Sequence, residues 1–408
     1  RTIKARKRRI DMEQQLFTVI GLSDGRELFL PPHIERIIRN GEVFSGGVRH
    51  RQIMENHLPQ GALWIDITTP LDDVFRRYAG HSHVVVFASG DPLFFGFATT
   101  IQKRLPQARV VTYPAFNSLQ MLAHELTMPY HDMQVVSLTG RPWQEFDNAL
   151  IRRTAKMGVL ADREHTPATI AARMLYYGYS GYTLFVGECL GNEEEQRIRT
   201  LSLEEASKES FKHPNNLILL AQGESRPRYF GIPDGEFELL HNRDKMITKA
   251  PLRLMDLSVL GLQNRRSFWD VGFCTGSVSI EARLQFPHLL VTSFEIRPEG
   301  EQLMEANSRR FGAPGIRSVI GDFTAQDLSS LPAPDAVFIG GHGGKLKEMM
   351  EQISRVLLPG GIVVFNSVSE NSYRLFLEAV AVTPLTLQNE CLVALDDNNP
   401  IRILSAVL

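Results

Sequence analysis

The segment Phe268–Gly276, FWDVGFCTG, decides the fold of the second half of the chain. Its pattern predicts a buried strand that ends in an acid, followed by a glycine-containing turn and a helix over residues 278–286. Glycines at such a turn let the backbone approach a ligand, and the N-terminus of the next helix attracts polar groups. We therefore expect a cofactor crevice at the end of this strand.

Acids at the ends of consecutive strands indicate which cofactor the crevice takes. Asp270 interrupts the dinucleotide fingerprint, because an acid there repels a pyrophosphate but can pair with an ammonium group. This favours S-adenosylmethionine over NAD. Glu295 closes the next strand, where it can accept both ribose hydroxyls, and Asp322 ends the third, where it can reach an adenine amino group. Three such acids favour a cofactor crevice over a set of helix caps and turns.

The chain as a whole alternates short apolar strands with helical stretches, which predicts an α/β protein with parallel sheets covered on both faces. The irregular, Pro- and Gly-containing stretch 223–243 predicts a linker. We expect a domain over 16–222, with lobes of about 16–114 and 115–222, and a second domain over 244–408. The predicted strands are 16–22, 84–90, 109–115, 133–140, 157–162, 182–188 and 216–221 in the first half, and 267–272, 289–296, 318–322, 335–341 and 361–368 in the second, with a weaker pair at 384–395 and 401–408.

Composition excludes several classes of protein. The 408 residues carry a net charge of -2 and no run of 18 apolar residues, so we expect neither nucleic-acid binding nor membrane insertion. The three cysteines are far apart, which argues against zinc and disulfides and for a cytoplasmic protein without a metal. Residues 1–15 form a basic stretch that we interpret as a disordered tail.

The second half resembles the CbiT-type methyltransferases of cobalamin biosynthesis. The resemblance rests on ITKAPLR at 247–253, WDVG with TGSVSIEA, GD at 321–322, DAVFIGGHGG and LLPGGIVVFNSV. It implies a class I Rossmann-like methyltransferase domain. The cofactor-binding residues are then Thr248, Asp270, Gly272, Phe273, Cys274, Thr275, Gly276, Glu295, Asp322 and Phe323. Cys274 stands where the family usually has glycine. A cysteine is accommodated at this position if its backbone angle is ordinary, and we expect such an angle.

The first half resembles the CbiE branch of the tetrapyrrole methyltransferases. GLSDG after the first strand, SGGVRH at 45–50, ASGDPLFFG at 88–96, TYPAFNS at 112–118 and SLTGR at 137–141 carry this resemblance. It implies a two-lobed class III methylase and a second S-adenosylmethionine site, hence two sites per chain. The residues carried over to that site are Gly21, Gly90, Asp91, Pro92, Gly96, Ala115 and Asn117.

Together the resemblances imply an enzyme that methylates a corrin precursor, precorrin-6B or its cobalt form, at C-5 and C-15. They also imply decarboxylation of the C-12 acetate to give precorrin-8, in a homo-oligomeric protein. A class I methyltransferase of RNA or protein with an N-terminal binding module is the alternative, although the sequence has neither a basic groove nor an NPPY-like tetrad. A nicotinamide dehydrogenase is disfavoured by Asp270.

A tetrapyrrole with many carboxylate arms requires basic groups around its site. The candidates are Arg49, Arg141, Lys249, Arg253 and Lys345, each of which is also explained by an ordinary surface charge. His342 follows the fourth strand of the second domain inside a glycine-rich loop, and we predict that it lies near the acetate that is lost. The alternative for His342 is a cap on the next helix or an exposed side chain. Methyl transfer itself requires positioning rather than an acid or base, so no nucleophile is predicted.

Overall fold

The computed structural model describes residues 14–23, 28–223, 227–242, 246–395 and 400–408. They form two compact units, one of residues up to 140, 155–169 and 183–220, the other of residues 141–154, 170–182 and 221–408. Most of the predicted basic tail lies outside the described residues. Gln15 is held by the fold, because its side-chain amide donates to the carbonyls of Tyr78 and His81 at 2.7 and 2.8 Å.

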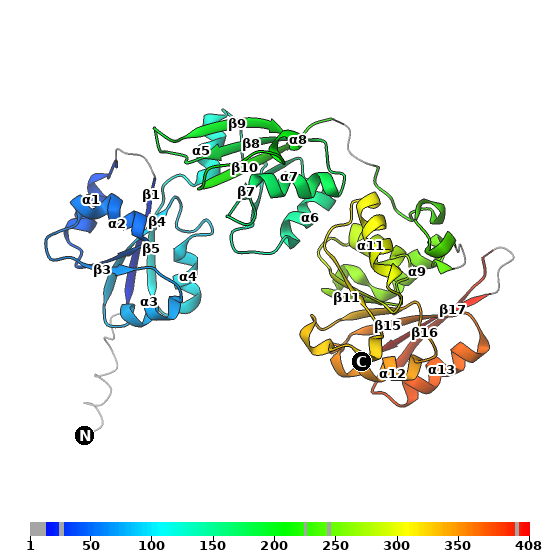
Figure 1. Cartoon of the computed structure of the whole chain (residues 1–408). Coiled ribbons are helices and arrows are strands. Elements are labelled where there is room, and N and C mark those ends of the chain that lie inside the picture. The colour runs from blue at the N-terminus through cyan, green and yellow to red at the C-terminus, as the bar shows by residue number, and fades with distance from the viewer. Residues whose placement is uncertain (1–13, 24–27, 224–226, 243–245, 396–399) are drawn as a thin grey trace, which may run out of the picture. The chain divides into compact units, whose positions relative to one another are not determined.

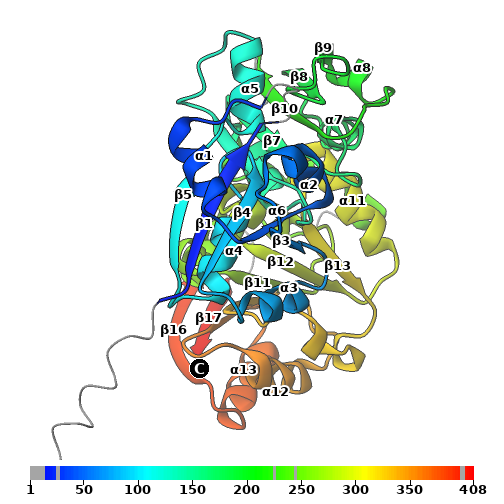
Figure 2. The same cartoon turned by 90° about the vertical axis from the view of Figure 1, so that its left-hand side faces the viewer.

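Sheet A, in the first unit, is parallel and has the strand order β3-β2-β4-β1-β5. Strands β1, β4 and β5 run side by side in it (Figure 2). Side chains alternate between its faces, so Val84 and Val86 pack with α3 and α4, whereas Val85 and Phe87 pack with α1 and α2. The elements are β1 (Leu16–Leu22), α1 (Pro32–Arg39), β2 (Val43–Gly46), α2 (Val48–Met54), β3 (Leu63–Asp66), α3 (Leu71–Tyr78), β4 (His83–Ser89), α4 (Phe97–Arg104) and β5 (Arg109–Tyr113).

Sheet B is mixed and has the order β6-β7-β10-β8-β9. Strands β6 and β7 are parallel, whereas β10 is antiparallel to β7 and β9 to β8. Helix α5 begins at a capping box of Asn117 and Gln120 and buries Leu119 and Leu122 with Ile218 of β10. The elements are α5 (Ser118–Glu125), β6 (Gln134–Ser137), α6 (Gln144–Arg152), β7 (Lys156–Leu160), α7 (Pro167–Tyr176), β8 (Tyr182–Glu188), β9 (Arg197–Ser202), α8 (Leu203–Ala206) and β10 (Asn215–Ala221).

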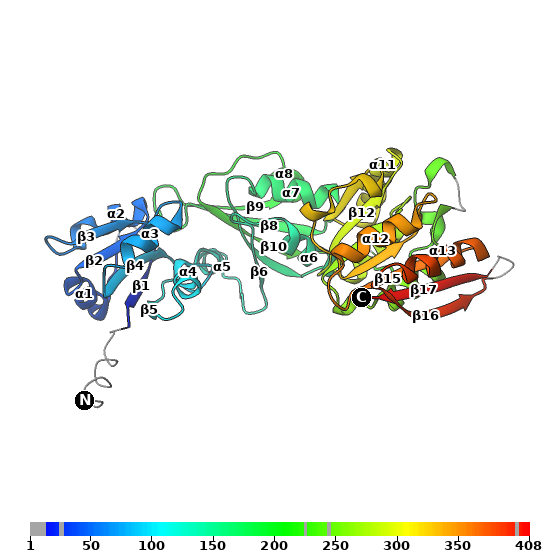
Figure 3. The same ribbon diagram turned by 90° about the horizontal axis from the view of Figure 1, so that it is seen from below.

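Sheet C, in the second unit, has the order β13-β12-β11-β14-β15-β17-β16. Its first five strands are parallel, and β17 runs antiparallel between β15 and β16 (Figure 3). The strand order reverses between β11 and β14, where open α/β sheets bind their ligands. The strands are β11 (Ser267–Val271), β12 (Leu290–Glu295), β13 (Ile316–Ile320), β14 (Ala336–Ile339), β15 (Ile362–Ser367), β16 (Thr386–Val393) and β17 (Ile401–Val407). The predicted class I sheet, with its weak C-terminal pair, is confirmed.

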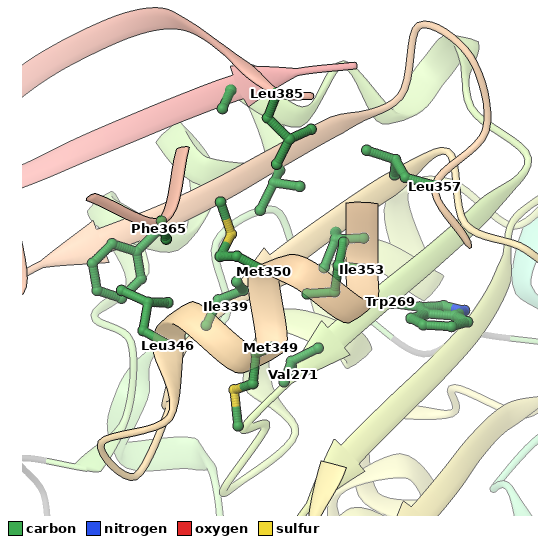
Figure 4. Close-up of a cluster of buried hydrophobic side chains, with 14 of the residues drawn as sticks. Trp269, Val271, Ile339, Leu346, Met349, Met350, Ile353, Leu357, Phe365 and Leu385 are labelled. Atoms are coloured by element: carbon green, nitrogen blue, oxygen red, sulfur yellow. The ribbon is translucent and has the colours of Figure 1, made fainter. Parts of the chain in front are cut away.

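Helices cover both faces of sheet C. On one face α12 (Leu346–Val356) buries Leu346 and Ile353 against Trp269 and Ile339 (Figure 4), and α13 (Glu370–Ala381) lies beside it (Figure 1). On the other face α9 (Ala250–Leu260) and α10 (Ser277–Gln285) pack against Phe268 and the neighbouring strands. Helix α11 (Glu299–Phe311) connects β12 to β13. In the described part of the chain, no helix is long and apolar enough to cross a membrane.

Part of the predicted linker packs onto the helices of the second unit. Ile232 and Phe237 are buried in one cluster with Ile280 of α10 and Met304 of α11. The backbone N–H of Glu238 donates to the side chain of Asn307 at 2.8 Å. The segment from Ile232 to Leu240 therefore belongs to the second unit, and its apolar residues were missed because they follow no regular period. The predicted boundary at residues 243–244 lies outside the described residues.

Candidate functional site

Two adjoining cavities lie at the carboxyl ends of β11, β12 and β14, where the sequence predicts a crevice. The larger has a volume of about 570 Å³ and the smaller about 140 Å³. Gly272, Arg297 and Gly341 line both. Of the predicted cofactor residues, Thr248, Phe273 and Cys274 line the larger cavity, while Glu295, Asp322 and Phe323 line the smaller.

The turn after β11 is shaped by close backbone contact. Gly272 has a φ of +79°, and a Cβ built there would lie 2.6 Å from the backbone N and O of Gly341. Cys274 has a φ of +51°, so the expectation of an ordinary backbone angle is wrong. The left-handed conformation turns the N–H of Cys274 to Glu295, whose Oε2 accepts it at 2.8 Å. The glycine-like geometry is thus kept without glycine, at a conformational cost of about 1–2 kcal/mol.

Glu295 is 3% exposed and is held in place on both oxygens. Besides the bond from Cys274, its Oε1 accepts the backbone N–H and an Nη1–H of Arg297, each at 3.0 Å. A carboxylate has about four acceptor positions, so Glu295 retains capacity for further hydroxyl donors. This placement is compatible with the predicted ribose contact.

Asp322 and Lys345 form an ion pair beside the smaller cavity. The Nζ of Lys345 lies 2.6 Å from Oδ2 of Asp322, while Oδ1 accepts from the N–H and hydroxyl of Thr324. The hydrogen bond from Lys345 lowers the pKa of Asp322. Lys345 therefore neutralises a predicted cofactor residue, a partner that the sequence analysis did not foresee. Phe323 is buried against the rings of Trp269 and Phe294.

Asp270 lies beneath the turn rather than in either cavity. It is 1% exposed, and its Oδ2 accepts the N–H and hydroxyl of Ser279 at 3.1 and 2.5 Å. Its Oδ1 is buried without a hydrogen-bond partner among the described residues. Burial raises the pKa of Asp270 to about 7. The predicted direct pairing with a ligand does not fit this placement, because the turn and Ser279 enclose the carboxylate.

Thr275 and Gly276 complete the turn and line neither of the two cavities described above. Thr275 is buried, and its carbonyl accepts from the side chain of Asn307. Gly276 has a φ of +77° and is the N-cap of α10, and a Cβ there would lie 2.6 Å from the sulfur of Met304. Both residues therefore shape the turn, and their predicted contact with a cofactor stays a prediction.

His342 lines the smaller cavity and is bonded within its own loop. Its Nδ1 accepts the backbone N–H of Gly344 at 3.1 Å, and its ring packs at 5.9 Å from Phe365. Burial lowers the pKa of His342. A neutral ring whose Nδ1 accepts must carry its proton on Nε2, so this histidine can donate one hydrogen bond.

Lys249 and Arg253 have different environments although both were predicted to bind substrate. Lys249 lines the larger cavity, 3.8 Å from Asp234. Arg253 is fully buried and donates to the carbonyls of Thr248 and Ile232, with Glu281 and Asp234 each at 3.3 Å. The prediction for Arg253 is wrong, because its donors are used inside the fold. It fixes the segment that carries Thr248 and Lys249.

In the first unit, the predicted glycine turns come together at the carboxyl end of sheet A. A Cβ on Gly21 would lie 1.9 Å from the carbonyl of Gly90 and 2.7 Å from the N of Ala115. Gly90 has a φ of +62°, and a Cβ there would lie 2.9 Å from Cα of Asn117. Four predicted residues from three separate segments of the chain are thus in backbone contact. Asn117 also caps α5, accepting the N–H of Gln120 at 2.9 Å.

The remaining residues predicted for the first unit surround this contact. Asp91 accepts the N–H of Leu93, and a Cβ on Gly96 would lie 2.4 Å from the carbonyl of Pro92, so residues 91–96 form a tight turn. Arg49 and His50 both contact Ser89, the residue before Gly90, at 3.3 and 3.0 Å. Burial and the neighbouring Arg49 lower the pKa of His50 to about 4. Arg141 is exposed and belongs to the second unit, and its predicted contact with substrate stays a prediction.

Comparison with known proteins finds a matching family for each half of the chain. Residues 17–207 match the tetrapyrrole (corrin/porphyrin) methylases, and residues 239–389 match the precorrin methyltransferase domain. A precorrin-6Y C(5,15)-methyltransferase (decarboxylating) from Sinorhizobium sp is 30% identical over 367 residues, covering 88% of this chain and 86% of that protein. The chain belongs to the precorrin-6Y C(5,15)-methyltransferase family.

Other relatives match only one part of the chain, and each of them is named for a single methylation. A cobalt-precorrin-6B C(15)-methyltransferase (decarboxylating) from Salmonella typhimurium is 36% identical over 133 residues, covering 33% of this chain and 68% of that protein. A cobalt-precorrin-7 C(5)-methyltransferase from the same organism is 29% identical over 184 residues, covering 44% of this chain and 88% of that protein. This chain is thus similar to proteins of both kinds.

The structure also places at or beside these two cavities several residues that the sequence analysis missed. Ile296, which is 61% exposed, and Arg297 line the smaller cavity directly after Glu295. Both residues could have been predicted from the sequence, because they directly follow the predicted strand-end acid Glu295. Asn366 lines the larger cavity and donates to Asp256 at 2.7 Å, and burial raises the pKa of this α9 acid to about 8. Asp256 could have been singled out from the sequence, because it is an acid within the largely apolar segment LRLMDLSVL.

Proposed function

We propose that this chain methylates a corrin precursor, precorrin-6B or its cobalt form, at two carbons and removes one carboxylate as CO₂. The first unit transfers a methyl group to C-5, and the second transfers one to C-15 and decarboxylates the C-12 acetate, giving precorrin-8. Membership of a family named for both positions carries this proposal. Cytoplasmic location and a homo-oligomeric state remain predictions.

The second unit has the groups that S-adenosylmethionine requires. Glu295 offers carboxylate oxygens to ribose hydroxyls, and the exposed apolar side chain of Ile296 offers a surface for a base. The buried Oδ1 of Asp270, without a partner among the described residues, favours a nearby cation. The residues present therefore fit a cationic nucleoside.

The first unit supports a second cofactor site by a different means. A Cβ on Gly21 would meet the carbonyl of Gly90 and the N of Ala115, so three backbone segments lie at one place with no room for a side chain on Gly21. Asp91 and Asn117 begin the tight turn and the helix that follow. This arrangement suits recognition by backbone N–H and C=O groups.

When bound, the cofactor supplies a methyl group that its sulfonium already activates. The chain's own residues then have to align the nucleophilic carbon with this methyl group and exclude water. In the second unit the apolar side chains of Leu252, Phe338 and Val393 line the cavity that serves this purpose.

Decarboxylation requires a sink for electrons. The bond between the acetate methylene and its carboxylate carbon breaks, the electron pair is delocalised into the macrocycle, and a proton from solvent completes the new methyl group. We assign His342 a supporting role, in which its Nε2–H donates to the substrate while Gly344 holds Nδ1. The backbone amides of the same loop provide further donors.

The test is to incubate the full chain with precorrin-6B or its cobalt form and isotopically labelled S-adenosylmethionine, and to follow the product by mass spectrometry. Two labelled methyl groups and the loss of one CO₂ are expected. A product that gains methyl groups but keeps every carboxylate would contradict the decarboxylation. Absence of label in the product of both substrates would contradict the function.

A further inference from the structure

The larger cavity of the second unit has an unusual charge distribution. Among the described residues that line it, the charged ones are Lys249 and Arg297, and none is an acid. Most other lining side chains are apolar, including Leu252, Phe338 and Ile401. A cavity with apolar walls and two cations suits an apolar ligand that carries anionic groups.

Both cations are held by acids that do not line this cavity. The Nζ of Lys249 lies 3.8 Å from Oδ2 of Asp234. Arg297 donates from its backbone N–H and from Nη1 to Oε1 of Glu295, each at 3.0 Å. The remaining donors of Arg297, on Nε and Nη2, have no hydrogen-bond partner within the described part of the chain, and the side chain is 44% exposed. An Arg restrained at one edge of its guanidinium presents the other edge with less loss of conformational entropy.

We propose that Arg297 is a specificity-determining residue that binds a carboxylate arm of the corrin precursor through the free edge of its guanidinium. This inference rests on the proposed function for the substrate class, and it adds a residue that neither the sequence motifs nor the family resemblance named. Lys249 is the second cation of the same cavity and receives another arm.

The chemistry of decarboxylation indicates which arm Arg297 binds. A carboxylate in a charge-assisted pair with Arg is stabilised and loses CO₂ less readily. The reacting acetate therefore belongs against the apolar wall, where its charge is not stabilised. Arg297 holds an arm that survives the reaction, so its loss weakens substrate binding more than it slows the chemical step.

The test uses the full chain with Arg297→Gln and, as the matched control, Arg317→Gln, which removes an exposed Arg that lines neither cavity. CO₂ release reports on the second unit, because C-5 methylation releases none. For Arg297→Gln we expect a 10- to 100-fold higher KM for the precursor, with kcat within about 3-fold. The loss of affinity for S-adenosylhomocysteine should be much smaller, because the variant removes only one of the three hydrogen bonds that hold Glu295. Arg297→Lys should recover part of the loss.

A second substrate isolates the contact. With a precursor whose non-reacting arms are amides, wild type and Arg297→Gln should have the same KM, because the variant then loses nothing further. An unchanged KM for the natural precursor would overturn the proposal, as would an equal loss of S-adenosylhomocysteine affinity, which would mean that Arg297 acts by holding Glu295.

Failure of the proposed function is recognised separately. If the wild type neither methylates nor releases CO₂, titration of the precursor by its visible absorption still measures binding. A weaker binding phase in Arg297→Gln would support the carboxylate contact in that case, and an unchanged titration would overturn it.

Discussion

The two candidate cofactor sites are built from different chemistry. In the second unit, the strand-end acids Glu295 and Asp322 line a cavity, each held by a cation and a backbone N–H. In the first unit, Gly21, Gly90 and Ala115 meet through their backbones with no room for a Cβ on Gly21. Under the proposed function, one cofactor class is recognised by charge in the second unit and by shape in the first. The two sites should therefore fail under different mutations.

The largest effect is expected for Gly21→Ala. Its Cβ would lie 1.9 Å from the carbonyl of Gly90, so the loops must separate. We expect the rate of C-5 methylation to fall at least about 100-fold. The free energy of unfolding of the first unit should fall by about 3 kcal/mol. CO₂ release by the second unit should stay within about 2-fold.

Gly80→Ala is the matched control, because nothing lies within 4 Å of a Cβ there. Product masses and chemical denaturation of both variants measure the difference. A Gly21→Ala enzyme that still methylates C-5 at the wild-type rate would contradict recognition by backbone in this unit.

Glu295→Ala tests the charge-based site. We expect binding of S-adenosylmethionine to the second unit to weaken by about 1.5–3 kcal/mol, the scale of charge-assisted hydrogen bonds. Binding to the first unit should not change. Calorimetry on the full chain measures both, with the exposed Glu299→Ala as control. Equal losses at both sites would point to general destabilisation.

The pH dependence of cofactor binding separates the sites further. Burial raises the pKa of Asp270 to about 7, with Ser279, Glu295 and Asp256 as its polar and charged neighbours. Asp270 is therefore neutral below this pH and ionised above it. Because the ionised form attracts a cationic ligand, affinity at the second unit should rise several-fold from pH 6 to pH 8.

Ionisation of the buried Asp270 also lowers the free energy of unfolding. The contribution that its raised pKa makes to stability is fully present below the unfolded pKa of about 3.9, and it is lost as the pH rises through about 7. Calorimetric titration with the cofactor at pH 6, 7 and 8 measures the affinity of each unit. The affinity of the first unit should not depend on pH, and in Asp270→Asn the affinity of the second unit should not depend on it either. A second-unit affinity that is independent of pH in the wild type would count against any role of Asp270 in binding.

The smallest effect concerns the left-handed residue of the acid-lined site. Cys274→Gly should raise the free energy of unfolding by about 0.5–1.5 kcal/mol, because glycine adopts a φ of +51° without strain. Cofactor affinity should not change, since the contact of this residue with Glu295 is through its backbone. Cys391→Gly, within β16, should instead destabilise the chain. Denaturant titration measures the stability of both variants. A Cys274→Gly protein that is less stable than the wild type would contradict the claim that the backbone of Cys274 is strained.

Long apolar strands and glycine turns could be predicted from the sequence, because their signals are local. Sheet C, its weak antiparallel pair and the strand-end acids were found in this way. Strands β2 and β3 were missed because four residues each carry little pattern, and β9 because RIRTLS has few apolar residues.

Partners in space could not be predicted. Nothing local indicates that Lys345 pairs with Asp322, 23 positions away, or that Arg253 is enclosed by Glu281 and the carbonyl of Ile232. The enclosure of Asp270 by Ser279 follows from the way α10 packs on β11, which sequence spacing alone does not give.

The central claim is that each unit binds the methyl donor by its own means, and calorimetric titration of the full chain with S-adenosylhomocysteine tests it most directly. About two sites per chain are predicted for the wild type, with only the first-unit site lost in Gly21→Ala. In Gly272→Ala, whose Cβ would lie 2.6 Å from Gly341, only the second-unit site should be lost. A single site in the wild type, or the loss of both sites in either variant while the chain stays folded, would contradict the account.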